Sequence, residues 1–136
     1  MLDAAGHLVL IDFGTCKDLW RPDLNGPEFC GTPGFMAPEI ASGKYSNKAD
    51  IYSLTVTFYD MALGRTEACK ASIPDMDADD PCAPLRPRDA ADASAAKTYE
   101  LLVFALRARS ADRPSAGALL AKIRELMASG AGAAGT

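Results

Sequence analysis

Two short motifs in the first forty residues could carry chemistry. Asp12-Phe13-Gly14 follows an apolar run, and Ala37-Pro38-Glu39 ends a long stretch rich in proline and glycine. Alone, the first tripeptide is also compatible with a plain turn that ends a strand, because Asp and Gly are common turn residues. The stretch between the motifs is long for a connection in a compact domain, which indicates a functional or disordered segment.

The order of these motifs resembles the signature of protein kinases, in which DFG and APE bracket the activation loop. Gly31-Thr32-Pro33 lies just before the second motif, and its context FCGTP is similar to that of the AGC-like serine/threonine group rather than of tyrosine kinases. Tyr45–Leu54 resembles the segment that opens the central helix of the kinase C-terminal lobe. Ala111–Ser115 resembles the segment before its last helix. The resemblance covers residues 1 to about 127.

The resemblance implies roles around the nucleotide. Asp12 would bind ATP through a Mg²⁺ ion, for which a carboxylate is a suitable hard ligand. Gly14 would let the chain turn, and Phe13 would pack inward. Thr32 would support catalysis by contacting a catalytic aspartate that this sequence lacks. We therefore expect ATP and Mg²⁺ as cofactors of the complete kinase domain, and no high-affinity binding by this chain alone.

Three further residues have structural roles by the same resemblance. Glu39 would pair with Arg113, which would tie the activation loop to the helical core, and Asp50 would brace the backbone of the catalytic loop. A buried ion pair adds little net stability, but removal of one partner costs about 3–5 kcal/mol.

Glu28 occupies the position where similar kinases carry a phosphorylated residue, and Lys17 stands where a lysine reaches toward that phosphate. We hypothesise that these two side chains pair and order the activation loop without phosphorylation. The carboxylate has one charge where a phosphate has about −1.5 to −2, so the pairing would be weaker. A solvated surface glutamate is the alternative.

Parts that phosphoryl transfer needs are missing from the sequence. It has no glycine-rich loop, no β3 lysine and no H-R-D-x-x-x-x-N loop. We therefore expect the isolated chain to be inactive. The alternatives are a fragment of a serine/threonine kinase, a non-catalytic interaction module, and a helical protein unrelated to kinases. Asp12 and the intact segment from Gly31 to Glu39 favour the first.

The elements that would position these residues are mainly helical, in an α+β arrangement. Residues 1–14 predict a short β-hairpin, and 46–63 predict a helix that is apolar on nearly every face and so lies inside a core. Residues 65–95 read as irregular or briefly helical. A helix is expected over 94–109 with Pro114 as its breaker, and another from Ser115. Residues 1–127 would form the partial domain and 128–136 a flexible tail.

The composition limits the classes of partner and the cellular compartment that we expect for this chain. The chain has 49% apolar and 24% charged residues with a net charge of −4, so nothing indicates a nucleic-acid or anionic membrane surface. We expect a protein substrate or a kinase N-terminal lobe as partner, no transmembrane segment, and an intracellular, cytoplasmic location. The four cysteines lack CxxC spacing, His7 reads as a surface turn residue, and the Asp75–Asp80 stretch reads as a solvated loop rather than a calcium site.

Overall fold

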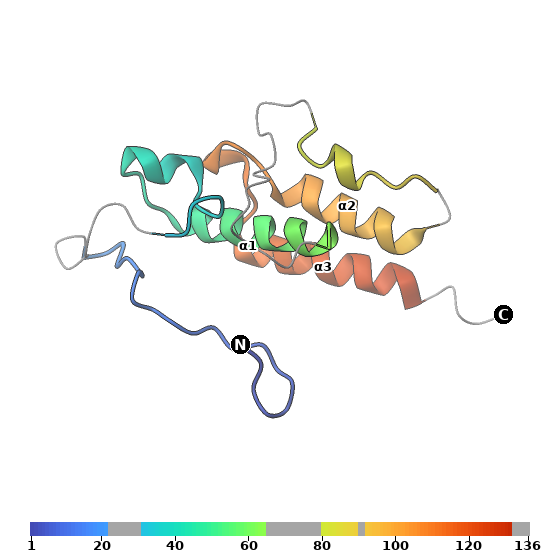
Figure 1. The fold of residues 1–136 in the computed structure, drawn as a ribbon, viewed down its shortest axis with the longest axis horizontal. Coiled ribbons are helices and arrows are strands. Elements are labelled where there is room, and N and C mark those ends of the chain that lie inside the picture. Colours follow the sequence, from blue (N-terminus) through green and yellow to red (C-terminus); the bar gives the residue numbers. More distant parts are fainter. Residues whose placement is uncertain (22–30, 65–79, 90–91, 132–136) are drawn as a thin grey trace.

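The computed structural model describes residues 1–21, 31–64, 80–89 and 92–131. Helix α2 contacts both α1 and α3, and the N-terminal end of the chain extends away from these helices (Figure 1). The helices are α1 (Asn47–Ala62), α2 (Ala93–Ala105) and α3 (Ala116–Ala131), with short 3-10 helices η2 (Pro38–Ser42), η3 (Ala83–Leu85) and η4 (Ser110–Asp112) between them. The described part is therefore mainly helical.

Local sequence fixes both ends of α1. The side chain of Ser46, the N-cap, accepts a hydrogen bond from the Lys48 amide at 3.3 Å. After Leu63 the chain turns at Gly64, whose φ of 68° is one that glycine adopts at little cost, and the Gly64 amide bonds to the Met61 carbonyl at 3.0 Å. The helix predicted over 46–63 is confirmed.

The burial of α1 is one-sided, although its sequence is apolar on nearly every face. Its buried side chains are Ile51, Tyr52, Thr55, Val56 and Tyr59. Leu54 and Met61, in contrast, are 42% and 67% exposed. The prediction that α1 is surrounded by core is therefore wrong for the described residues, because α2 and the 3-10 turns cover only one side of it.

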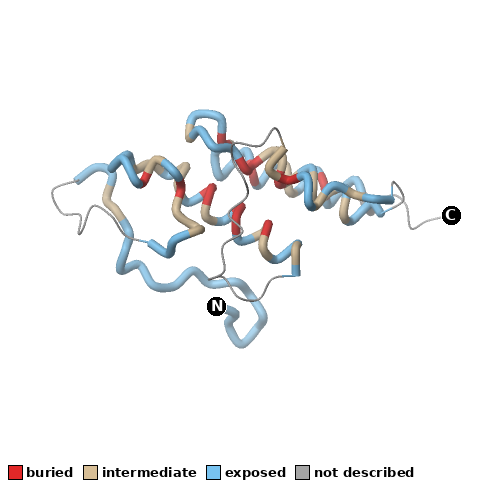
Figure 2. Tube along the Cα trace, turned by 45° about the horizontal axis from the view of Figure 1, so that its top comes forward, coloured by how far each residue is buried: buried red, intermediate tan, exposed pale blue. Residues whose placement is uncertain are grey.

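The main core lies between α1, α2 and the segment around η3. Tyr52, Val56 and Tyr59 of α1 meet Leu102 of α2, which is fully buried, and Cys82 from the turn before η3. Figure 2 shows the buried positions along the facing sides of the helices. Burial raises the pKa of the Cys82 thiol to about 11, so this thiol stays protonated and packs as a small apolar group.

The end of α2 differs from the prediction. The helix stops at Ala105 rather than near Arg109, because Leu106 has an extended backbone (φ −82°, ψ 94°). Pro114 therefore lies well beyond the end of α2 and is not its breaker. The next helix does begin after Ser115, whose hydroxyl accepts from the Ala118 amide at 3.1 Å.

The expected tail over 128–136 overlaps the end of the last helix. Helix α3 continues to Ala131, past the expected start of the tail at 128. Residues 132–136 lie outside the described part. Of the predicted irregular stretch 65–95, the described residues contain η3 and the first turn of α2.

The predicted N-terminal hairpin is reduced to a single antiparallel bridge between Leu2 and Leu8. The described residues contain no β-strand beyond this bridge. The turn itself is well defined. The Asp3 carboxylate accepts hydrogen bonds from the amides of Ala5 and His7, and the Asp3 amide bonds to the His7 carbonyl at 2.9 Å. The apolar residues after the turn are exposed, Leu8 by 87% and Leu10 by 85%, so little burial stabilises a strand pair here.

Candidate functional site

The best-defined polar centre joins the loop before α1 to the connection before α3. Arg113 is only 2% exposed, and its Nη1 and Nη2 donate to the two carboxylate oxygens of Glu39 at 2.6 and 2.8 Å. The remaining N–H groups of Arg113 donate to the carbonyls of Arg107 (2.8 Å), Lys48 (3.0 Å) and Ala108 (2.8 Å). All five donors of the guanidinium are thus used. We call this arrangement the Glu39–Arg113 clasp.

Electrostatics in the clasp favour the charged form of Glu39. Burial of the carboxyl raises its pKa, but the hydrogen bonds from Arg113, a backbone hydrogen bond and the Arg113 charge lower it, and the net shift is downward. Glu39 is therefore ionised at neutral pH, and its carboxylate neutralises the buried guanidinium. The arrangement can fix the position of η2 against the helices; it offers no nucleophile or base.

Two residues that complete the clasp were not identified from the sequence. The Tyr52 ring lies under the guanidinium of Arg113, 4.8 Å from its carbon to the ring centroid, and adds a cation–π contact. The Lys48 ammonium donates to the Arg113 carbonyl. Tyr52 stands where the resembling kinase segment has tryptophan, and that aromatic position was the one available signal.

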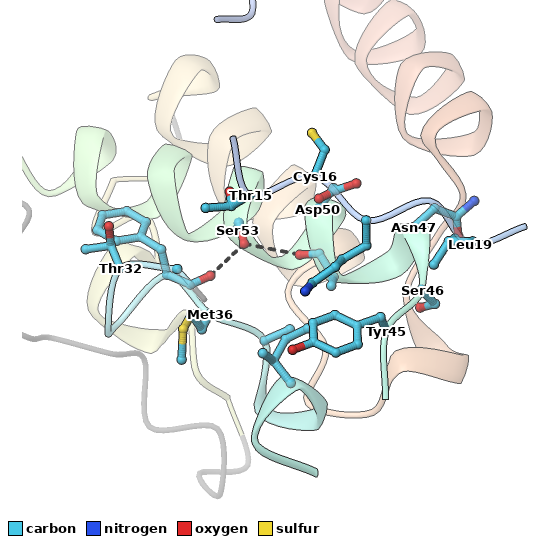
Figure 3. Close-up of a pocket in the computed structure, with 16 residues that line it drawn as sticks. Thr15, Cys16, Leu19, Thr32, Met36, Tyr45, Ser46, Asn47, Asp50 and Ser53 are labelled. Carbon is cyan, nitrogen blue, oxygen red and sulfur yellow. Dashed lines mark hydrogen bonds between the residues drawn. The ribbon is translucent and has the colours of Figure 1, made fainter. Parts of the chain in front are cut away.

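A pocket of about 300 Å³ lies beside the clasp, between the N-terminal half of α1 and the segments on either side of the gap at 22–30. Figure 3 shows Thr32 and Met36 on one side of the pocket and Ser46 and Asn47 on the other. Asp50 contributes an exposed carboxylate. The pocket is thus built from the segment that follows the DFG motif, the segment around the start of the APE motif and the first turns of α1.

One hydrogen bond connects α1 to the loop that carries Thr32. The Ser53 hydroxyl donates to the Phe35 carbonyl at 2.6 Å and lies 3.2 Å from the Ala49 carbonyl (Figure 3). The loop itself closes on a turn in which the Phe35 amide bonds to the Thr32 carbonyl at 3.1 Å. Thr32 is exposed at the mouth of the pocket, as are its neighbours Gly31 and Pro33.

The DFG residues do not line this pocket, although the residue that follows them, Thr15, does. Asp12 is exposed, with a φ of 63°, and its carboxylate accepts from the Gly14 amide at 3.3 Å. Phe13 is 67% exposed, so the expectation that it packs inward is wrong here. An inward Phe13 needs an apolar cavity to receive it, and the described residues around it provide none.

Lys17 lines the pocket, and its ammonium lies over the Tyr45 ring at 5.3 Å from the centroid. Glu28, its hypothesised partner, lies outside the described residues, as does Cys30. The Lys17–Glu28 pair therefore stays a hypothesis.

Asp12 is suited to one part of a magnesium site. Its carboxylate is a hard oxygen ligand and faces solvent, but among the described residues no group of three or more His, Cys, Asp or Glu side chains gathers around any point. Mg²⁺ takes six oxygen ligands, several of them from water and phosphate.

Comparison with known proteins gives a consistent result. Residues 1–123 match the family model described as protein kinase domain. The chain is 43% identical over 67 residues to atypical protein kinase C of Drosophila melanogaster and to protein kinase C delta type of Rattus norvegicus, and 42% identical to protein kinase C zeta type of Oryctolagus cuniculus.

Each of these alignments covers 48% of this chain but only 10–11% of the relative, so the chain spans a small part of the kinases it matches. No solved structure matches the chain at a significant level. Among the described residues, none of the helices has the length and apolar character required to cross a lipid bilayer.

Proposed function

This chain belongs to the protein kinase domain family, and on that premise we propose that its residues 1–127 are a C-terminal-lobe part of a serine/threonine protein kinase domain. The Glu39–Arg113 clasp carries this proposal. It joins the APE motif to the arginine before α3, 74 positions away, in the bidentate geometry that suits a guanidinium and a carboxylate.

In the complete domain, the activity is transfer of the ATP γ-phosphate to serine or threonine of a protein substrate. Such transfer depends on positioning and on neutralising the charge of the phosphates, which a bound magnesium ion provides. Asp12 would hold that ion, and Thr32 would contact the catalytic aspartate from the mouth of the pocket. Asp50 would brace the backbone of the loop that carries this aspartate.

The chain alone is inactive under this proposal. Its sequence contains neither the catalytic H-R-D-x-x-x-x-N loop nor the glycine-rich loop and β3 lysine that position ATP. The pocket beside Asp50 is a surface on which another part of a kinase domain would pack.

A fusion experiment tests the proposal. Residues 1–136 are joined behind the part of a protein kinase C catalytic domain that runs from its glycine-rich loop through its H-R-D-x-x-x-x-N loop. We expect the fusion to transfer labelled phosphate from ATP to a serine peptide, the Asp12→Asn fusion to lose this transfer by several orders of magnitude, and the chain alone to show none.

Asp112→Asn serves as the control, since this exposed carboxylate has no proposed role. A folded fusion without activity, or full activity after Asp12→Asn, would contradict the proposal.

A non-catalytic interaction module is the second candidate, and the exposed apolar residues Leu54 and Met61 on α1 favour it. The same fusion distinguishes the two. A fusion that folds with a raised melting temperature but transfers no phosphate supports a module that docks on a kinase part without completing it.

A further inference from the structure

Three hydroxyl side chains stand at alternate positions of α1, and one of them bonds differently from the other two. The hydroxyls of Thr55 and Thr57 donate to the carbonyls four residues earlier in the same helix, at 2.7 and 2.9 Å, as is usual for hydroxyls inside a helix. Ser53 lies 3.2 Å from the equivalent carbonyl of Ala49 but 2.6 Å from the carbonyl of Phe35, in the segment before η2. A hydroxyl has one hydrogen to donate, and the shorter distance directs it to Phe35.

The acceptor, Phe35, belongs to a turn at the mouth of the pocket. Its side chain packs against the main core, and its amide closes the turn by bonding to the Thr32 carbonyl at 3.1 Å. Thr32 itself is exposed, together with Gly31 and Pro33. Thr32 and Ser53 line the same pocket, and Figure 3 shows the bond from Ser53 as a dashed line. The Ser53 hydroxyl thus holds the turn that carries Thr32 against α1.

We propose that Ser53 is a positioning residue, which fixes this turn and through it sets how well the complete domain binds its protein substrate. The second part rests on the proposed function, in which Thr32 contacts the catalytic aspartate, the group that accepts the proton of the substrate hydroxyl. Asp12, the residue proposed to bind ATP through Mg²⁺, does not line the pocket. Loss of the Ser53 hydroxyl therefore disturbs binding of the protein substrate and leaves that of ATP unchanged.

Limited proteolysis of the full chain tests the hold on the turn. Chymotrypsin cleaves on the carboxyl side of phenylalanine, so it must attack the same Phe35 carbonyl that Ser53 binds. The exposed Phe13 gives a reference cut in the same molecule. In Ser53→Ala we expect the rate of cleavage after Phe35, relative to that after Phe13, to rise about fivefold, the change in an opening equilibrium that corresponds to one hydrogen bond.

Two variants on α1 are matched controls. Thr57→Ala removes a hydroxyl that donates to the Ser53 carbonyl of its own helix, so the cleavage ratio should equal that of the wild type. Ser53→Thr keeps the hydroxyl and should also remain close to the wild type. Far-UV circular dichroism checks that the helices persist in each variant.

The kinase fusion described above tests the consequence for substrate binding. Ser53→Ala should raise the KM for the serine peptide severalfold and leave the KM for ATP unchanged, whereas Thr57→Ala should change neither. A loss of folded protein lowers the apparent kcat but alters neither KM, so this split separates positioning from stability.

An unchanged cleavage ratio in Ser53→Ala, a raised ratio in Thr57→Ala or Ser53→Thr, or an equal increase of both KM values would each overturn the proposal. A folded parent fusion without activity contradicts the proposed function alone, and the cleavage ratio then decides the role of Ser53.

Discussion

Glu39→Gln perturbs the clasp while nearly keeping its volume. Arg113 is 2% exposed and directs two of its five hydrogen bonds to the Glu39 carboxylate. The substitution removes the counter-charge, and the buried guanidinium is left with three backbone carbonyls and one amide oxygen as acceptors. Loss of one partner from a buried pair costs about 3–5 kcal/mol. We expect about 3 kcal/mol, the lower end, because glutamine still accepts one hydrogen bond and Glu39 is not fully buried.

Urea unfolding at pH 7, followed by far-UV circular dichroism, measures this loss. Asp112→Asn is the matched control, because it removes the carboxylate of an exposed pair with Arg109, 3.8 Å apart, right next to Arg113 in the sequence. Exposed ion pairs contribute little to stability, so the control should unfold at the same urea concentration as the wild type. If Glu39→Gln lowers the free energy of unfolding by less than 1 kcal/mol, the clasp does not hold the fold as argued.

The pH dependence gives a second measurement on the same variant. Folding lowers the pKa of Glu39 from its ordinary 4.5. The stability that the ionised carboxylate contributes is therefore fully present above pH 4.5 and is lost as the pH falls through the folded-state pKa. The stability difference between wild type and Glu39→Gln should therefore be largest near neutrality and shrink below pH 4.5. A difference that stays constant from pH 7 to pH 3 would refute the electrostatic explanation.

Three further predictions concern packing and the backbone. Leu102→Ala should cost about 2–5 kcal/mol in urea unfolding because Leu102 is fully buried between the helices, whereas Leu120→Ala, at an exposed position, should have little effect. Tyr99→Phe should cost about 1 kcal/mol, because it removes the hydrogen bond of 2.6 Å from the hydroxyl to the Asp80 carboxylate; an unchanged unfolding midpoint would count against this contact. Gly31→Ala should lower the melting temperature, because its φ of 138° is unfavourable for alanine and the new Cβ would lie 2.7 Å from the Met36 side chain; an equal or higher melting temperature would show that the turn differs.

Local signals in the sequence predicted the helix starts well. Ser46 and Ser115 each accept from an amide two or three residues on, and Gly64 ends the first helix, because caps depend on neighbouring residues alone. The end of α2 coincides with a tertiary contact. The carbonyls of Arg107 and Ala108, just beyond the helix, accept hydrogen bonds from Arg113, whose guanidinium also binds Glu39. Periodicity contains no information about such a contact.

For the candidate site too, some predictions were confirmed and others were wrong. The partners Glu39 and Arg113 were expected through the resemblance to kinases, since no pattern within the chain relates positions so far apart. The inward packing of Phe13 was inferred from the same resemblance and fails because it requires neighbours that the described residues do not supply. The burial of α1 was overestimated for a related reason, since hydrophobicity shows which faces can be covered but not what covers them.

The reactivity of the buried Cys82 thiol can report how often the core of this fold opens. Cys82 is 1% exposed, whereas Cys16 is open to solvent, so a thiol reagent at pH 8 should modify the two at very different rates. Modification of Cys82 requires the segment around η3 to separate from α1 and α2. Its rate therefore measures how often the core opens under native conditions, without any denaturant.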